Sequence, residues 1–375
     1  MMRVRSLLFA LLAACSAAAV AAQQDAAWGH AEPGRVLRLP ADHASHPEYR
    51  IEWWYYTGNL TSTDGRRFGY QLTFFRIGVD PSPANPSRWA VRDLFMGHLA
   101  VTDIGARRHR AVERLSRPGV GWAGARTDGY RVWIDDWSVE LQNGRHRLTA
   151  ASATPPFAID LSLAEGKPPA FHGDGGFSRK GSQAGNASHY YSLTRMPKRG
   201  TIRLGDERVD VEGASWMDHE FGSSFLEESQ VGWDWFSIQL DDGEDLMLFQ
   251  LRGSEGLIDP RSSGTVVARN GHTSSLASEA FTLTPGRRWA SPTTSASYPV
   301  EWRIDAPGQN LALTVKAALD AQEMHAGLQS GVAYWEGAVD VGGRRNGRPV
   351  TGRGYLEMTG YSGRAMGEML GRVRP

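Results

Sequence analysis

The sequence predicts an all-β fold of two antiparallel β-barrel domains packed together. The first observation is a tryptophan-rich phrase that occurs twice, over residues 53–60 and 233–240, which align without a gap. The second is a series of β-forming runs separated by turn residues at the spacing of an all-β sandwich or barrel. The third is the lack of a long helical pattern, with 362–370 as a weak helix candidate.

Each copy of the phrase opens a predicted β-hairpin. An Asp64-Gly65 turn follows the first copy and an Asp242-Gly243 turn follows the second, and both turns lead into a further β-forming run. An Asp-Gly pair between two such runs is a strong hairpin signal. The matched pair favours an internal duplication, although unrelated hairpins can share this pattern.

The remaining elements follow in chain order. The predicted strands of the first half are residues 53–60, 68–77, 94–103, 130–134, 137–141, 146–150, 157–163, 190–195 and 201–204. Those of the second half are residues 233–240, 245–252, 265–269, 280–283, 300–304, 311–316, 332–341 and 352–358. About eight strands in each half is the size at which a closed barrel holds one small ligand.

Length and charge narrow the class of protein. A chain of 375 residues is long enough for two domains, which we place at residues 36–222 and 223–375 after a polar leader at 23–35. The formal net charge is zero, so there is no basic excess that would bind nucleic acid or a membrane surface.

The N-terminus predicts export to a bacterial periplasm or cell envelope. A basic start precedes an apolar stretch at 6–14 that is too short to span a bilayer. Residues 1–22 read as a signal peptide with small-residue cleavage. Alternatively, Leu12-Ala13-Ala14-Cys15 resembles a lipobox, which would lipidate the only cysteine and anchor the protein to the membrane. Either way, no disulfide can form in the rest of the chain.

The densest group of polar and aromatic residues lies at 213–222, near the expected domain junction. In an extended chain Trp216, Asp218 and Glu220 point to one side. His219 points to the other side, together with Met217 and Phe221. A carboxyl group buried among aromatic rings has a raised pKa and can donate a proton near neutral pH. Alternatively, the two carboxylates are structural and pair with arginines or backbone amides.

Other candidates are polar groups within aromatic runs. Glu52 either lines a pocket or faces solvent at a strand end, and His98 is expected to be a core histidine. His172 in its glycine-rich loop and His189 are expected at a barrel mouth, because such loops often carry function. Glu336 is a further polar group among aromatic residues.

Several common catalytic signals are absent from the sequence. There is no Gly-x-Ser-x-Gly elbow, phosphate-binding loop, dinucleotide fingerprint or zinc motif, which argues against a serine or metallo-hydrolase and predicts no cofactor or metal. The segment from His43 to His46 could bind metal weakly, but Pro47 and its leader position predict an exposed loop.

The chain resembles the AttH/CrtC-like family at several motifs. They are residues 52–60, 172–178, 187–196, 213–224, 232–240 and 334–339. The resemblance extends from about residue 45 to 362 and implies two lipocalin-like barrels. The family includes carotenoid 1,2-hydratases and exported proteins called predicted secreted hydrolases, some encoded beside ABC-transporter components. The export signal is more similar to that of the second group.

These observations yield a concrete hypothesis: the protein binds an apolar isoprenoid- or lipid-like molecule and hydrates a double bond without a cofactor. Asp218 or Glu220 would protonate the alkene, and His219 or Asp234 would orient the water. Tryptophan faces can stabilise the cation, and we assign this role to Trp216, Trp233 and Trp235. The further expected ligand contacts are Trp53, Tyr55, His172, His189, Tyr191 and Glu336.

Two other classes stay open. A non-catalytic lipocalin-type carrier would use the same aromatic residues as an apolar pocket and deliver its ligand to an ABC transporter. A structural envelope protein would use them to fill two cores. An enzyme differs from both in needing a buried ionisable group with a raised pKa that faces the pocket.

Overall fold

The computed structural model describes residues 28–362 except 88, 184, 224, 225, 228 and 326–329. The predicted signal peptide, the lipidation site Cys15 and all but the first residue of the weak helix candidate therefore lie outside the described residues. Helical structure in the described part is limited to three single 3₁₀ turns, which are η1 (Ala41–His43), η2 (Ser278–Ala280) and η3 (Pro307–Gln309). Within these residues, no helix has the length and apolar character needed to cross a membrane.

The first half of the described chain forms one antiparallel sheet. Its strands are β1 (Ile51–Ser62), β2 (Arg67–Gly78), β3 (Asp93–Asp103), β4 (Arg108–Ser116), β5 (Ala123–Ala125), β6 (Arg131–Ile134), β7 (Trp137–Gln142), β8 (Arg145–Ala153), β9 (Pro156–Leu163), β10 (Ala170–Phe171), β11 (Phe177–Arg179), β12 (Ala187–Leu204) and β13 (Glu207–Gly222). The spatial order is β4-β3-β2-β1-β13-β12-β9-β8-β7-β6-β5, with β10 and β11 pairing with β12. Because β6 returns to contact β3 and β4, the sheet is a nearly closed barrel.

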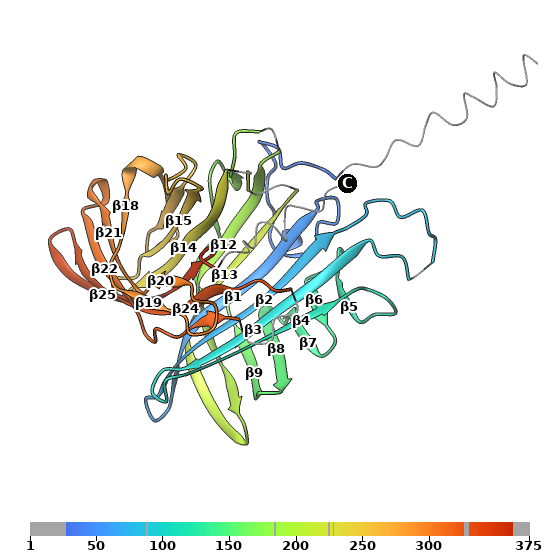
Figure 1. Ribbon diagram of the computed structural model, residues 1–375, viewed down its shortest axis with the longest axis horizontal. Coiled ribbons are helices and arrows are strands. Elements are labelled where there is room, and N and C mark those ends of the chain that lie inside the picture. Colours follow the sequence, from blue (N-terminus) through green and yellow to red (C-terminus); the bar gives the residue numbers. More distant parts are fainter. Residues whose placement is uncertain are drawn as a thin grey trace, which may run out of the picture.

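The second half forms a separate, more open sheet. Its strands are β14 (Gln230–Leu240), β15 (Asp245–Gly253), β16 (Ser263–Val267), β17 (Thr273–Ala277), β18 (Thr282–Pro285), β21 (Glu301–Ala306), β22 (Leu311–Ala317), β23 (Glu323–Met324), β24 (Tyr334–Arg345) and β25 (Arg348–Met358). A small ribbon of β19 (Arg288–Ala290) and β20 (Ser297–Pro299) lies beside it. Figure 1 shows this half-barrel beside the first barrel.

The predicted all-β fold is confirmed, and its two hairpins occupy matching places. β1 lies between β2 and β13, and β14 lies between β15 and β25. An Asn143-Gly144 turn joins β7 to β8, with positive φ at both residues, as a type I′ hairpin requires. The division into domains at residue 222 and the duplication stay predictions.

Two differences from the predicted strands have local causes. The runs 190–195 and 201–204 belong to one long strand, β12, which continues through a bulge between Leu193 and Met196. Strand β4 was not predicted because it alternates charged and apolar residues in a stretch rich in arginine, so only one of its faces is buried. A search for hydrophobic runs in the sequence therefore misses edge strands such as β4.

Alternation within each strand separates a barrel interior from an outer face. Trp54 and Tyr56 of β1 face the core of the first barrel, and Phe236 and Ile238 of β14 face the core of the second sheet. The residues between them, such as Tyr55 and Trp235, belong to a third apolar cluster. This cluster joins the outer faces of the two sheets.

Candidate functional site

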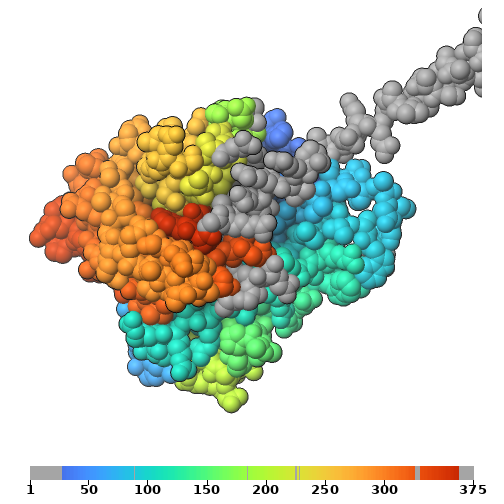
Figure 2. Space-filling model, viewed as in Figure 1, coloured from blue at the N-terminus to red at the C-terminus, as the bar shows by residue number. Residues whose placement is uncertain are grey.

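The two sheets contact each other through their tryptophan-rich hairpins. The rings of Tyr55 and Trp235 meet edge to face, with centroids 5.1 Å apart. The Tyr55 hydroxyl donates to Glu336 Oε1 at 2.6 Å, and Trp235 Nε1 donates to the Tyr190 hydroxyl at 3.1 Å. In Figure 2 the blue to green parts of the first half lie against the orange to red parts of the second. Each sheet thus donates a hydrogen bond to the other.

A pocket of about 90 Å³ lies between the sheets, and we call it the inter-sheet pocket. Its walls combine aromatic and aliphatic side chains with one lysine and three carboxyl groups. The lining residues are Ile51, Trp53, Tyr55, Gln71, Thr73, Phe75, Lys180, Tyr190, Asp218, Glu220, Leu226, Trp233, Trp235, Phe249, Leu251 and Glu357. Aromatic walls with a few convergent polar groups are typical of small-molecule sites.

Asp218 is a buried carboxyl group in this pocket, held by three donors. Trp216 Nε1 donates to Oδ1 and the Tyr190 hydroxyl to Oδ2, both at 2.6 Å, and the Ser192 hydroxyl also donates to Oδ1. Burial raises the pKa of Asp218 to about 7, although these hydrogen bonds act in the opposite direction. The desolvation of the charged form is therefore the larger effect, and the group carries its proton for much of the time near neutral pH.

Glu220 has a different environment, although it is only two residues away on the same face of β13. Its Oε1 lies 3.1 Å from Lys180 Nζ and also accepts from the Ser188 hydroxyl. The Lys180 ammonium in turn lies over the rings of Tyr190 and Phe249, at 4.9 and 4.2 Å from their centroids. The pair therefore places a carboxyl group that is ion-paired with a lysine beside Asp218.

The second sheet contributes two more acidic groups. Glu357 on β25 accepts from Trp233 Nε1 at 3.2 Å, and burial raises its pKa to about 7. Glu336 on the neighbouring β24 lies opposite Glu357 in the strand register, and burial raises its pKa well above the ordinary value. Carboxyl groups that hold protons thus come from both sides of the pocket.

The pocket brings together both predicted acids and several of the predicted ligand contacts. Six of the thirteen predicted site residues line it, namely Trp53, Tyr55, Asp218, Glu220, Trp233 and Trp235. Trp216 supports Asp218 by its hydrogen bond, and Glu336 contacts the pocket wall through Tyr55. The predicted alternation along 213–222 is what places Asp218 and Glu220 on the same side.

His172 is not at an exposed barrel mouth, as predicted, but is buried between the sheets. Its Nδ1 lies 2.8 Å from Thr265 Oγ1, and its Nε2 lies 2.6 Å from Ser192 Oγ. Burial lowers the pKa of His172 to about 3, so the ring is neutral. Because Ser192 also contacts Asp218, His172 is one hydrogen bond removed from the predicted acid. The glycine-rich segment folds inward through β10 and β11, which pair with β12.

Four predicted residues lie away from the pocket, within the two sheets. His219 and Tyr191 face the interior of the first barrel, where the Tyr191 hydroxyl lies 3.1 Å from His219 Nδ1. His189 is also buried in strand β12, not in a loop, and contacts the ring of Phe221. Asp234 faces the interior of the second sheet, where it lies 3.1 Å from Arg252 Nε. The predicted water-orienting role of His219 or Asp234 therefore does not fit their placement.

The interior of the first barrel holds a polar network that the sequence analysis underestimated. Glu52 is fully buried and contacts Arg76 Nε, His46 Nδ1 and His219 Nε2 at 2.9–3.1 Å. Neither predicted position for Glu52, in a pocket or at a solvent-facing strand end, is correct. His98 is a buried, hydrogen-bonded histidine as expected, but it lies on the outer face of the first sheet, with Nε2 2.9 Å from Glu113 and Nδ1 2.6 Å from the Tyr334 hydroxyl of the second sheet.

The predicted exposed loop at His43 to His46 is also buried. Both histidines lie within the first barrel, because the segment before β1 folds into its end. Two groups in this region bring three possible metal ligands together: His46, Glu52 and His219, and His43, His146 and Glu165. The second group draws on three distant segments, so spacing within a motif could not have revealed it.

Sequence reasoning also missed pocket residues of the second half and of the loop before β12. Glu357 and Lys180 belong to no recognisable sequence motif. Tyr190 was considered only as part of the motif that contains His189. The one available signal for Glu357 was its position on the strand that pairs with the second tryptophan-rich strand, Trp235 lying opposite Glu357. That pairing could not be assigned from sequence alone.

Comparisons with known proteins agree with this architecture. The AttH-like family model matches residues 30–361. The crystal structure of an AttH candidate from Nitrosomonas europaea shares 34% identity, with 89% of this chain and 99% of that chain aligned and a TM-score of 0.81. Kievitone hydratase from Nectria haematococca shares 14% identity, with 90% and 97% aligned and a TM-score of 0.67, which shows the same fold. A search of curated proteins gave no match.

The family model covers almost all of the described residues, and a solved relative aligns over nearly its whole length. The lipocalin-like pair of sheets is the fold of both solved neighbours. The chain belongs to the AttH-like family.

Proposed function

We propose that the protein binds an apolar isoprenoid- or lipid-like molecule in the inter-sheet pocket and adds water across one of its double bonds. The observation that carries this proposal is Asp218, a carboxyl group with a pKa of about 7 in an aromatic pocket. A proton donor with a pKa near the working pH is the requirement for general acid catalysis. The pocket volume fits the end group of a ligand better than a whole long chain.

In the first step the Asp218 carboxylic acid transfers its proton to one alkene carbon. The π bond supplies the electrons of the new C–H bond, and the other carbon becomes a tertiary cation. Trp233, Trp235 and Tyr55 line the pocket and present electron-rich rings to that charge. Trp216, Tyr190 and Ser192 stabilise the Asp218 carboxylate that is left.

In the second step a water oxygen forms a bond to the cation and loses a proton. Glu220 lines the same pocket and its pairing with Lys180 keeps a carboxylate available to accept that proton. Neutral His172 positions Ser192, which holds the Asp218 carboxyl group in place. The sum of both steps is alkene plus water to alcohol, with a proton moved from Asp218 to Glu220 that solvent exchange restores.

The comparison with kievitone hydratase supports this proposal, because a protein named as a hydratase uses the same fold. The proposal includes export of the mature protein, with or without a lipid at Cys15, and an ABC transporter as a partner. Mass spectrometry of the N-terminus of protein purified from its own cell envelope would identify the cleavage site and any attached lipid.

The test uses two linear isoprenoid alcohols, farnesol and geranylgeraniol, as probes in H₂¹⁸O. Binding of a probe should quench the tryptophan fluorescence of the wild-type protein. The wild-type protein should also incorporate ¹⁸O into the product, as measured by mass spectrometry. Asp218→Asn should retain the quenching and lose the incorporation. Binding without incorporation in the wild type would indicate a carrier, and full turnover by Asp218→Asn would contradict the assignment of the acid.

A further inference from the structure

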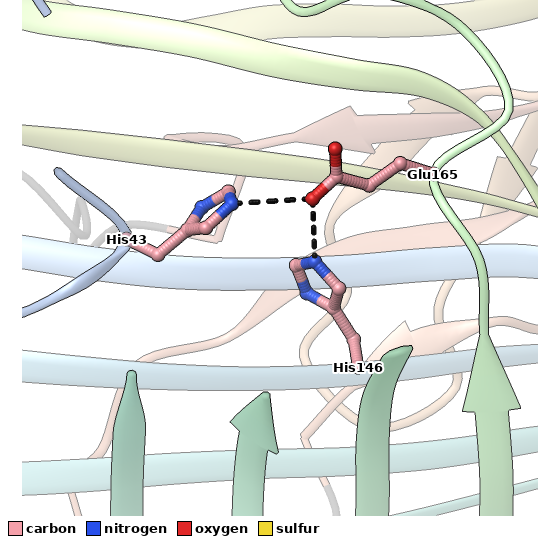
Figure 3. Close-up of side chains that lie close together, drawn as sticks. All are labelled: His43, His146 and Glu165. Atoms are coloured by element: carbon pink, nitrogen blue, oxygen red, sulfur yellow. Dashed lines mark hydrogen bonds and ion pairs between the residues drawn. The ribbon is translucent and has the colours of Figure 1, made fainter. Parts of the chain in front are cut away.

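A second preorganised group of side chains lies inside the first barrel, apart from the inter-sheet pocket. Figure 3 shows His43, His146 and Glu165 converging on one point. His43 comes from η1, His146 from β8, and Glu165 from the segment after β9. Nε2 of each histidine lies 3.3 Å from the same Glu165 oxygen, Oε1. Three separate parts of the chain thus supply one compact set of nitrogen and oxygen atoms.

Hydrogen bonds from the barrel fix the orientation of both imidazole rings. His43 Nδ1 lies 2.6 Å from the Tyr191 hydroxyl, and His146 Nδ1 lies 2.7 Å from the Tyr56 hydroxyl. Tyr56 continues the chain of hydrogen bonds to Tyr130 at 2.6 Å. Metal-binding histidines usually make such a bond through the nitrogen that does not bind the metal, which leaves the other nitrogen free to coordinate.

The distances suit a tetrahedral metal ion. Bonds of about 2.0–2.1 Å to nitrogen and oxygen at tetrahedral angles separate neighbouring ligand atoms by about 3.3–3.4 Å. Both separations from Glu165 Oε1 are 3.3 Å, and the three ligand atoms all lie within 4.8 Å of one another. The two imidazole rings are nearly perpendicular, at 82°, so they approach the common point from different directions.

The group is buried on one side and open on the other. The side chains of His43 and His146 have no exposed surface, whereas that of Glu165 is 39% exposed. An ion can therefore arrive from the Glu165 side, and a water molecule can fill the fourth position there. Two histidines and one glutamate with an open position form a common zinc ligand set.

The neighbouring group of His46, Glu52 and His219 provides an internal contrast. Arg76 already neutralises Glu52 with its Nε 3.1 Å from Oε2, and Ser45 donates to the same oxygen at 2.7 Å. A divalent cation would have to displace or repel the buried guanidinium. Among the described residues no basic side chain forms a comparable ion pair with Glu165, apart from the two histidines. The difference selects the first group as the metal site.

We propose that His43, His146 and Glu165 form a binding site for a divalent d-block cation, of which Zn²⁺ fits the ligand types best. The ion would fasten η1, and with it the segment that leads into β1, to the end of the first barrel. This site is independent of the proposed hydration. It contradicts the expectation of no metal, which rested on the spacing of neighbouring residues.

The experiment measures Zn²⁺ bound to the full protein after chelation and dialysis against buffered Zn²⁺. We expect one equivalent for each chain by elemental mass spectrometry, and a visible Co²⁺ spectrum with the strong bands of tetrahedral coordination. Glu165→Gln keeps the shape of the side chain and, because the group is partly exposed, leaves the fold intact. It should weaken Zn²⁺ binding by at least about tenfold.

Two further variants separate this site from adventitious binding. Glu48→Gln, another half-exposed glutamate near the same end of the barrel, should bind Zn²⁺ like the wild type. His146→Gln should abolish the Co²⁺ spectrum and the rise in melting temperature that Zn²⁺ gives. Binding that is unchanged in Glu165→Gln, or no stoichiometric Zn²⁺ in the wild type, would overturn the proposal.

Discussion

The two tryptophan-rich hairpins share an ion pair on the inner face and an aromatic contact on the outer face, but they belong to sheets with different interiors. In both, a buried carboxylate pairs with the arginine near the end of the second strand: Glu52 with Arg76 in the first sheet, and Asp234 with Arg252 in the second. On the outer faces, Tyr55 and Trp235 meet across the interface. The interiors then diverge, because histidines, tyrosines and glutamates fill part of the first barrel and apolar residues fill the second sheet.

The comparison extends to the strands that flank the pocket. Tyr190, Ser192 and Asp218 in the first sheet correspond in register to Tyr334, Glu336 and Glu357 in the second. Burial raises the pKa of both Asp218 and Glu357 to about 7. Only Asp218 has three hydrogen-bond donors that would stabilise the carboxylate left by proton transfer. The matching arrangement of strands thus places Asp218 and Glu357 in equivalent positions. The hydrogen bonds around each acid distinguish their roles.

The largest expected effect is on catalysis, and it tests the difference between the two acids. Asp218→Asn should lower turnover of the isoprenoid probes by about 10²–10⁴-fold, because it removes the general acid. Glu357→Gln should lower turnover less, because the loss of one hydrogen-bonded wall group leaves the acid in place. The rate of ¹⁸O incorporation measures both. An equal loss in the two variants would show that the sheets contribute alike.

The next effect concerns the buried ion pairs inside the two sheets. Glu52→Gln should reduce the free energy of unfolding by about 3–5 kcal/mol, because it breaks a buried ion pair and leaves the Arg76 guanidinium with Asp93 as its remaining carboxylate. The change also weakens the contacts of Glu52 with His46 and His219. Asp234→Asn should cost less, since the Arg252 side chain is 16% exposed against 2% for Arg76 and water can solvate it. Urea denaturation compares the two variants. Equal losses would mean that the two pairs are equally desolvated.

How much of this arrangement the sequence predicts depends on whether contacts are local. The Asp-Gly turns predict the hairpins, and the alternation of Trp216, Asp218 and Glu220 predicts that they share a face. The pairing of β12 with β13, which brings Tyr190 to Asp218, joins residues 28 apart and leaves no local signal. The same holds for Tyr55 and Glu336, which are 281 residues apart. Site residues contributed by another sheet therefore need the tertiary structure.

A third test follows the pH dependence of stability. The pKa of Asp218 rises on folding from 3.8 to about 7, so the folded state holds a proton that the unfolded state releases between these values. The contribution of Asp218 to the free energy of unfolding should be greatest below pH 3.8. It should fall by up to about 1.4 kcal/mol for each pH unit as the pH rises to about 7. Asp218→Asn should remove this contribution to the slope, while Glu357, whose pKa burial also raises to about 7, keeps its own. Denaturation series at several pH values measure it, and an unchanged slope would mean that Asp218 ionises normally.

The smallest expected effects come from the hydrogen bonds that Tyr55 and Trp235 make across the interface. Tyr55→Phe removes the donor to Glu336 Oε1 and should cost about 1–3 kcal/mol of unfolding free energy, because this buried carboxyl group keeps only a long contact with Gln71 Nε2, at 3.5 Å. Trp235→Phe removes the donor to Tyr190, which still bonds to Asp218, so its hydrogen-bond loss should be about 0.5–1.5 kcal/mol. The order of the two losses matters more than their size. Each hydrogen bond runs from one sheet to the other, and Glu336 loses its short hydrogen bond in the first variant whereas Tyr190 keeps its short bond to Asp218 in the second. A reversed order would show that Tyr190, and with it the geometry of the proposed acid, is held chiefly from the opposite sheet.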